Sequence, residues 1–148
     1  MKVAGILIVI LALAVGIVPQ FTDCQSQGKA LALANGNTVP MKCHWTAMAA
    51  LAMAVPLLAL GGIMAFSRRK ETQRALSALG VAMGAIVALL PTALIGVCAN
   101  GMMLCNNTMQ PTLLFSGTLI GATSLVTLAL SRKDEAQPVV LPRMEQPA

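Results

Sequence analysis

The sequence predicts an all-α membrane protein in which four transmembrane helices form two hairpins and both termini are cytoplasmic. Hydrophobic residues make up 57% of the 148-residue chain and charged residues only 10%, whereas a soluble domain is typically about 25% charged. Four apolar stretches contain no Asp, Glu, Lys or Arg; they cover residues 3–21, 45–66, 75–97 and 112–130. A helix crosses the hydrocarbon core of a bilayer with about 20 apolar residues, and its backbone groups pair within the helix. Residues 1–130 are therefore predicted to form one transmembrane domain.

The positions of the basic residues predict the side of the membrane on which each connection lies. Most of them fall before the first stretch, between the second and third, or after the fourth; these are Lys2, Arg68, Arg69, Lys70, Arg74, Arg132, Lys133 and Arg143. Only Lys29 and Lys42 fall in the other connections. Cytoplasmic loops are enriched in Lys and Arg, so this arrangement explains the net charge of +5 through topology and not through binding of nucleic acid. Recruitment of a cytoplasmic partner or of anionic membrane lipid is the alternative role for these side chains.

The first stretch is expected to stay in the protein as a helix. Lys2 precedes an apolar run, as in a signal peptide, but no small-x-small cleavage site lies just after the run, and Ala32-Leu33-Ala34 is too far downstream. The outer connections then cover residues 22–44 and 98–110, and a short interfacial helix is expected at residues 29–34. Residues 131–148 are rich in Pro, Gln and charge, which predicts a disordered cytoplasmic tail.

The two hairpins resemble degenerate copies of each other. Each outgoing helix has a proline near its outer end, Pro19 or Pro91, followed within seven residues by a cysteine. Each returning helix is preceded by Met-x-Cys-x-x-Thr, at residues 41–46 and 103–108. This pattern fits a parallel repeat in which both halves enter the membrane from the same side.

Glycine pairs one turn apart predict close helix packing. Gly80 and Gly84 lie on the third helix, and Gly117 and Gly121 on the fourth. Small residues at this spacing allow helix backbones to approach each other. The pairs are expected to serve packing inside the bundle, and docking against a partner's transmembrane helix is the alternative.

The cysteines carry the main chemical signal of the sequence. All of them lie in the outer connections or at the outer ends of helices: Cys24, Cys43, Cys98 and Cys105. An even number of cysteines in an oxidising compartment favours structural disulfides. Pairing within each loop is the simplest of the three connectivities, and pairing between loops would join the two hairpins instead.

Two other kinds of chemistry could use the same residues. Thiol–disulfide exchange, as in quinone-linked membrane oxidases, normally uses Cys-x-x-Cys, and this spacing is absent here. A copper site is the second, because thiol and thioether ligands suit Cu(I); the candidate ligands near the outer face are Met41, Cys43, His44, Met48, Met102, Met103, Cys105 and Met109. Against this, methionine packs readily in apolar cores, and His44 beside Trp45 fits an interfacial anchor. The sequence therefore predicts no bound metal or cofactor and no catalytic residues.

Two motifs resemble those of one bacterial family of small four-helix membrane proteins of unknown function. They are Cys-His-Trp-Thr at residues 43–46 and Pro-Thr-x-Leu-Ile-Gly-Val-Cys at residues 91–98. The resemblance covers about residues 3–130, and its recurrent positions map onto Cys24, Cys43, His44, Trp45, Thr46, Pro91, Cys98, Met103 and Cys105. Members of this family often accompany ABC transporters with MacB/FtsX-type permeases. The resemblance implies a bacterial inner-membrane protein and gives no catalytic residues.

These observations together predict a non-enzymatic accessory subunit that binds a transporter permease through its helices. Its outer loops would form a cap braced by disulfides, with Met41, His44, Trp45, Thr46 and Met103 as the signature of that face. A homo-oligomer is the alternative assembly. The runner-up function is an extracytoplasmic thiol-redox or copper-handling protein.

Overall fold

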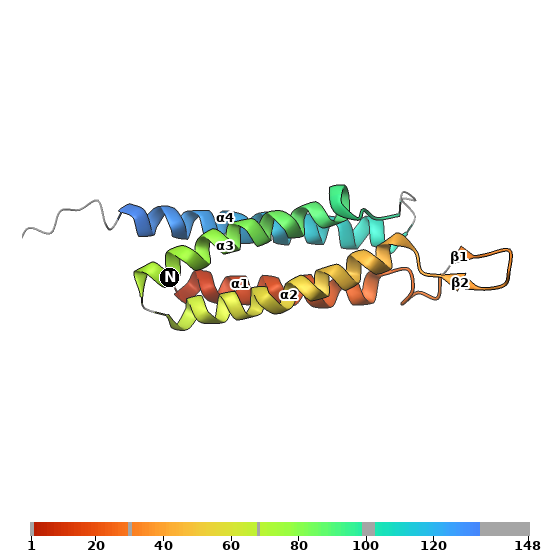
Figure 1. Cartoon of the computed structure of the whole chain (residues 1–148), viewed down its shortest axis with the longest axis horizontal. Coiled ribbons are helices and arrows are strands. Elements are labelled where there is room, and N and C mark those ends of the chain that lie inside the picture. The colour runs from red at the N-terminus through yellow and green to blue at the C-terminus, as the bar shows by residue number, and fades with distance from the viewer. Residues whose placement is uncertain (1, 30, 68, 99–102, 134–148) are drawn as a thin grey trace, which may run out of the picture.

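The computed structural model describes residues 2–29, 31–67, 69–98 and 103–133. Four long helices lie side by side as a bundle (Figure 1): α1 (Lys2–Thr22), α2 (Lys42–Phe66), α3 (Lys70–Leu89) and α4 (Gln110–Lys133). The four segments built on them are long and apolar enough to cross a membrane, which confirms the prediction of a four-helix membrane protein. Residues 131–133 of the predicted tail are helical, and residues 134–148 lie outside the described residues.

Each helix buries one narrow stripe and leaves a wider apolar surface exposed. In α1 the buried positions include Ile8, Ala12 and Val15, spaced three or four residues apart, as expected for one face of a helix. The remaining faces are also apolar: Ile6, Ile10 and Ile17, for example, are each more than half exposed. A helix that is apolar on every side suits a lipid environment.

The third predicted span differs from the structure near Pro91. The α-helix α3 ends at Leu89 and continues as a π-helical turn, η1 (Leu90–Leu94). Proline lacks an N–H and its ring crowds the carbonyl one turn earlier, which disturbs the regular ladder. The N–H groups of Ile95 and Gly96 both donate to the carbonyl of Leu90, at 3.2 and 3.1 Å. The predicted helix over 75–97 is therefore wrong at its end.

The chain leaves η1 through Gly96 and returns through a second π-helical turn. Gly96 has a φ of +84°, a left-handed conformation that commonly ends a helix. The turn η2 (Cys105–Met109) then leads directly into α4, so the helical segment begins before the predicted start at 112.

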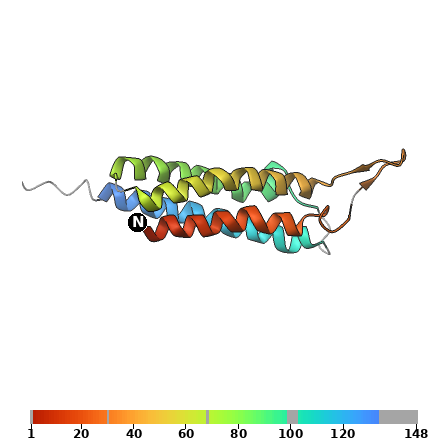
Figure 2. The same ribbon diagram turned by 90° about the horizontal axis from the view of Figure 1, so that it is seen from below.

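Contacts between helices divide the bundle into two pairs. The helix α1 packs mainly against α2, and α3 mainly against α4 (Figure 1); we call these pairs the first and second hairpins. All four helices run along the same long axis (Figure 2). Glycines allow the closest approach in both. A Cβ on Gly5 would lie 2.7 Å from the backbone nitrogen of Ala65 in α2, and a Cβ on Gly84 would lie 2.6 Å from that of Gly121 in α4. These contacts are the small-residue packing that membrane helices use.

Three of the four glycines that the sequence predicts to serve helix packing lie in close contact with the other helix of the second hairpin. A Cβ on Gly117 would lie 2.6 Å from the backbone nitrogen of Ala88, and a Cβ on Gly80 would meet the hydroxyl of Ser124. Gly121 differs, because its own Cβ position has no neighbouring atom within 4 Å. The face carrying Gly80 and Gly84 therefore packs inside the molecule.

The two ends of the bundle carry different residues. The start of α1, the end of α4 and the turn between α2 and α3 lie at one end (Figure 1), which we call the basic end. The cysteines lie at the other, the cysteine end. Beyond it projects a small antiparallel hairpin of β1 (Leu31–Ala32) and β2 (Thr38–Val39). The short helix expected at residues 29–34 is wrong, since this segment contains β1.

Candidate metal centre

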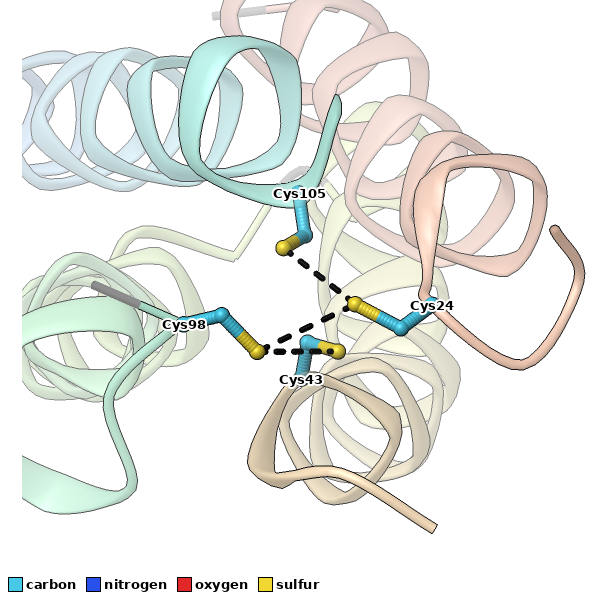
Figure 3. A group of neighbouring side chains, drawn as sticks. All are labelled: Cys24, Cys43, Cys98 and Cys105. Carbon is cyan, nitrogen blue, oxygen red and sulfur yellow. Dashed lines mark hydrogen bonds between the residues drawn. The ribbon is translucent and has the colours of Figure 1, made fainter. Parts of the chain in front are cut away.

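Each of the four helical segments contributes one cysteine to the cysteine end (Figure 3). Cys24 follows the end of α1, Cys43 lies in the first turn of α2, Cys98 follows η1, and Cys105 begins η2. Their Sγ atoms all lie within 4.8 Å of one another. We call this group the thiol cluster. Residues up to 81 positions apart in the chain thus meet at one point.

Three sulfur–sulfur contacts cross between the hairpins within the thiol cluster. Cys43 and Cys98 are 3.6 Å apart, Cys98 and Cys24 are 3.8 Å apart, and Cys24 and Cys105 are 3.5 Å apart. Each of these three contacts joins the first hairpin to the second (Figure 3). The thiols within each hairpin, Cys24 with Cys43 and Cys98 with Cys105, also lie within 4.8 Å of each other, so the four thiols form one network.

The disulfides expected from the sequence are not formed in this structure. All four cysteines are free thiols, and the separations above are well beyond the length of about 2.05 Å of a disulfide bond. The Sγ atoms lie within 4.8 Å of one another both within and across the loops, so the positions of the thiols select none of the three connectivities.

Most of the thiol cluster is shielded from solvent. Cys24, Cys43 and Cys105 are buried, at 2%, 0% and 0% exposure, whereas Cys98 is half-buried. Three of these sulfurs belong to the hydrophobic core of the bundle. A solute that approaches the cluster from the side of Cys98 meets the least covered sulfur.

Two methionines extend the sulfur group in a symmetrical way. The Sδ atom of Met41 lies 4.0 Å from the Sγ atom of Cys98, and the Sδ atom of Met103 lies 4.0 Å from that of Cys24. Each methionine precedes a cysteine of its own hairpin by two residues but contacts a cysteine of the other hairpin. Both methionine side chains are half-buried. The signature residues Met41 and Met103 thus lie beside the thiol cluster.

The ionisation of the thiols follows from their surroundings. Burial raises the pKa of the Cys24 thiol, and hydrogen bonding with neighbouring thiols raises it further. Burial also acts to raise the pKa of Cys98, but hydrogen bonding with the thiols of Cys43 and Cys24 outweighs it, so the pKa of Cys98 is lowered. Because hydrogen bonds to the charged form favour that form, Cys98 is the thiol of this pair that ionises first.

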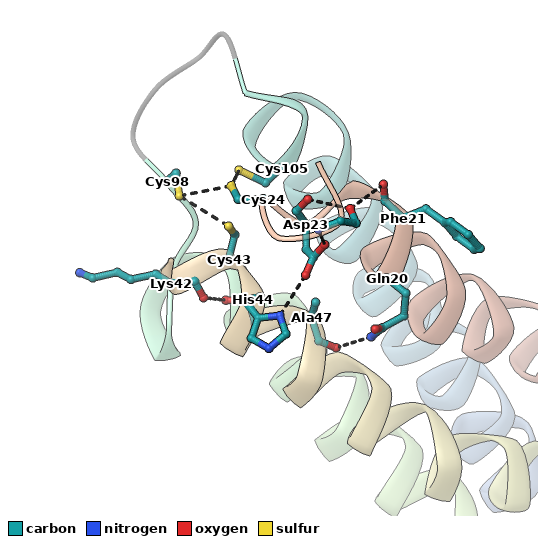
Figure 4. Close-up of polar contacts among 12 residues, drawn as sticks. Gln20, Phe21, Asp23, Cys24, Lys42, Cys43, His44, Ala47, Cys98 and Cys105 are labelled. Carbon is teal, nitrogen blue, oxygen red and sulfur yellow. Dashed lines mark hydrogen bonds and ion pairs between the residues drawn. The ribbon is translucent and has the colours of Figure 1, made fainter. Parts of the chain in front are cut away.

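An Asp–His pair, with Asp23 buried and His44 half-buried, lies beside the thiol cluster (Figure 4). The Nδ1 atom of His44 lies 3.0 Å from the Oδ2 atom of Asp23, and the backbone N–H of Ser26 donates to Asp23 Oδ1 at 2.7 Å. Burial acts to raise the pKa of Asp23, but hydrogen bonds from His44 and Ser26 outweigh it and lower the pKa overall. Asp23 is therefore a carboxylate at neutral pH, and Nδ1 of His44 carries the proton that it accepts.

This pair changes the expected role of His44. The histidine engages Asp23 and is not one of the four residues whose ligand atoms converge. Since Asp23 adjoins Cys24 and His44 adjoins Cys43 in the chain, the pair ties the end of α1 to the start of α2 next to two of the thiols. Asp23 was not among the residues predicted from the sequence to form the site.

Thr46 is buried, whereas its neighbour Trp45 is exposed. The buried hydroxyl of Thr46 donates to the carbonyl of Gly96 at 2.7 Å, which fixes the segment before Cys98 against α2. Trp45 is 59% exposed, and its ring meets that of His44 edge-on with 6.1 Å between the centroids. An exposed Trp at the end of an apolar helix fits an interfacial anchor.

Comparison with known proteins gives a family but no activity. The family described as Domain of unknown function (DUF4418) matches residues 2–130. The chain belongs to this family. The DUF4418 match covers the transmembrane bundle up to residue 130 and includes the whole thiol cluster and the Asp23–His44 pair. No curated protein and no solved structure matches the chain.

Proposed function

We propose that the protein binds a soft metal ion, Cu(I), through its thiol cluster. The observation that carries this proposal is the convergence of four cysteine sulfurs, one from each helical segment, within 4.8 Å of one another. This is a binding function and assigns no catalytic residues.

The spacing of the sulfurs suits a tetrahedral thiolate site. A metal ion with four metal–sulfur bonds of about 2.3 Å holds its ligands about 3.8 Å apart. The three sulfur–sulfur contacts are 3.5, 3.6 and 3.8 Å. Only small side-chain movements are then needed for the sulfurs to bind one ion.

The methionines favour Cu(I) over Zn(II). Thioether sulfur is a soft ligand that suits Cu(I), whereas structural zinc sites use cysteine and histidine. Met41 and Met103 each place a thioether 4.0 Å from a cluster thiol. They would serve as additional ligands or as the first ligands that an arriving ion meets.

The proposed location follows from the distribution of charge and from the family resemblance. The basic turn between α2 and α3 would face the cytoplasm, which puts the cysteine end on the outer side of a bacterial inner membrane. The thiol cluster would then bind metal at the extracytoplasmic surface while the apolar helices hold the protein in lipid.

Metal binding to reduced protein in detergent tests this function directly. Anaerobic titration with Cu(I) against a chromophoric Cu(I) chelator is expected to show one tightly bound ion per chain, with Zn(II) bound more weakly. Cys43→Ser should abolish tight binding, since it removes one of four ligands. Ala50→Ser is the matched control, because it introduces the same hydroxyl at another fully buried position of α2. Failure of the reduced wild-type protein to bind Cu(I) would contradict the proposal.

An accessory role beside a MacB/FtsX-type permease is the second proposal. It rests on the resemblance noted in the sequence, and the β1–β2 hairpin supports it, because this hairpin extends beyond the bundle with Leu31 and Val39 exposed. Gly80 and Gly84 pack against α4 inside the molecule, so a partner would have to bind other surfaces. A homo-oligomer is the alternative outcome.

Copurification in mild detergent from native membranes tests the accessory role. The doubly substituted Leu31→Ser, Val39→Ser protein is expected to lose the permease, whereas Leu125→Ser on the exposed side of α4 should keep it. A wild-type protein that purifies without any permease would count against this role and leave the metal proposal untouched.

A further inference from the structure

We infer that a groove between α1 and α2 at the basic end binds an anionic phospholipid. One acyl chain of the lipid lies along the groove, and the headgroup phosphate pairs with the ammonium group of Lys2, which lines it. The groove lies at the opposite end of the bundle from the thiol cluster (Figure 1). It is therefore independent of the proposed metal binding.

Two consecutive glycines of α2 leave room for the groove. A Cβ on Gly61 would lie 3.0 Å from the carbonyl oxygen of Gly5, so this glycine faces α1 and lets the two backbones meet. Gly62 lines the groove, and its own Cβ position has no neighbouring atom within 4 Å. The surface between the two helices is hollow at this level because Gly62 has no side chain to fill it.

The groove has the length of an acyl chain within one leaflet. Its volume is about 430 Å³. On α1 it extends from Lys2 to Ile10, which corresponds to about 12 Å along a helix that rises 1.5 Å per residue. One leaflet contributes about 15 Å to the hydrocarbon core of a bilayer. The groove therefore spans most of the depth of the leaflet at the basic end.

The walls of the groove are apolar and accessible. Apart from Lys2, the lining residues are Ile6, Val9, Ile10, Gly62, Ala65 and Phe66. Ile6 and Ile10 are more than half exposed, and Phe66 is exposed almost completely. An acyl chain can contact these side chains, but every membrane lipid has such chains, and lipid is as apolar as the protein surface. Selectivity for one lipid must therefore come from its headgroup.

The charge at the end of the groove favours an anionic headgroup. Lys2 is exposed and is the first residue of α1. The first N–H groups of a helix have no partner within the helix, and the helix dipole adds positive potential there. In the neighbouring turn, Arg69 and Lys70 outnumber Glu71. A phosphatidylethanolamine headgroup carries its own ammonium group, whereas phosphatidylglycerol has a net negative charge, so the site favours phosphatidylglycerol.

Two other grooves of comparable size lack this charge. One, of about 340 Å³, lies further along α1 and α2 toward the cysteine end, where Gly16 and Val55 line it. The other, of about 420 Å³, lies between α1 and α4, where Val3 and Leu130 line it. Neither is lined by a charged side chain. Lys2 thus distinguishes the proposed site from grooves that any membrane lipid would fill.

Fluorescence quenching by brominated lipid tests the site in the full-length protein. Trp45 is the only tryptophan, so Trp45→Phe combined with Phe66→Trp places a single fluorophore at the groove. This reporter protein is reconstituted in mixtures of phosphatidylglycerol and phosphatidylethanolamine with bromine on the chains of one lipid or the other. The quenching is expected to show at least about a fivefold preference for phosphatidylglycerol. Equal quenching by both lipids would overturn the inference.

A pair of charge variants separates a site from general attraction to the basic end. Lys2→Gln in the reporter protein should lower the preference for phosphatidylglycerol by about fivefold, because it removes one cation near the membrane surface. Arg132→Gln is the matched control, since it removes an exposed cation at the same end that does not line the groove. It should leave the preference unchanged. An equal loss in both variants would overturn the assignment of a site.

A pair of glycine variants tests the role of the groove itself. Gly62→Leu in the reporter protein should remove the preference, because the new side chain fills the space that the acyl chain would occupy. Gly121→Leu is the matched control, because its Cβ position is equally open but lies outside the groove. Thermal unfolding in detergent checks that both variants are folded. A folded Gly62→Leu protein with the full preference would overturn the inference.

Discussion

The two hairpins are alike at the cysteine end and different within the bundle. At the cysteine end each contributes one cysteine after its outgoing helix, a methionine, and a second cysteine two residues later. Each methionine and each second cysteine contacts the first cysteine of the other hairpin. The two halves therefore make the same contacts with each other.

Within each hairpin the two helices approach each other most closely at a different level along the bundle. In the first hairpin the close glycine contact joins Gly5 to Gly61 and Ala65 near the basic end. In the second it joins Gly84 to Gly117 and Gly121, nearer the cysteine end. The described parts of the outer connections also differ, since the first contains a β-hairpin and the second contains π-helical turns. Helix packing thus tolerates variation between the halves, whereas the sulfur geometry is the same in both.

The largest loss of Cu(I) affinity is expected when equivalent cysteines of the two hairpins are removed, which tests whether both hairpins bind the metal. Cys24→Ser and Cys98→Ser remove equivalent ligands, so each should lower Cu(I) affinity by at least about a hundredfold. Chelator competition on reduced protein measures both. Wild-type affinity in one variant and loss in the other would show that the halves do not share the ion.

Glycine substitutions test the difference in helix packing. Gly84→Ala forces a Cβ against the backbone of Gly121 and should destabilise the protein by about 2 kcal/mol. Gly121→Ala is the matched control, because its Cβ enters open space. Thermal unfolding in detergent measures both, and equal unfolding temperatures would contradict the packing described for the second hairpin.

Alkylation rates separate Cys24 and Cys98, the equivalent cysteines with opposite pKa shifts. The lowered pKa of Cys98 gives more thiolate at neutral pH, and the raised pKa of Cys24 gives less. Cys98 should therefore react with iodoacetamide at least about tenfold faster, and its rate should level off at a lower pH than that of an ordinary thiol. Mass spectrometry over a range of pH follows both residues. Faster alkylation of Cys24 would reverse the assignment.

Methionine substitutions should have the smallest effect. Met41→Leu and Met103→Leu each remove one thioether beside the cluster and are expected to weaken Cu(I) binding by about fivefold while leaving Zn(II) binding unchanged. Met48→Leu, on the exposed side of α2, is the control. An equal loss for both metals would mean that the methionines act through packing.

Much of the fold could be predicted because lipid limits the choices. Runs without charge predicted four helices, since a transmembrane segment must satisfy its own backbone. The outer ends of the third and fourth helices were harder to predict, because the π-helical turns depend on the contacts that Pro91 and Gly96 make with the rest of the bundle. The hydrophobic stretch itself continues through residue 97, so it does not mark where the α-helix ends.

The site was harder to predict because it depends on contacts between distant segments. Cys24 lies 74 residues from Cys98 and 81 from Cys105, so spacing in the chain favoured pairing within each loop. The repeated Met-x-Cys motif was the usable signal, because two copies that pack against each other bring their equivalent residues together. Asp23 was overlooked because its partner, His44, lies 21 residues away. Their positions next to Cys24 and Cys43 were the available clue.

Copper X-ray absorption on the anaerobically loaded, membrane-extracted protein tests the central claim most directly. The account predicts one Cu(I) per chain, surrounded by sulfur alone at about 2.3 Å. Nitrogen or oxygen atoms bound to the copper, or no copper retained by the reduced wild-type protein, would contradict the account.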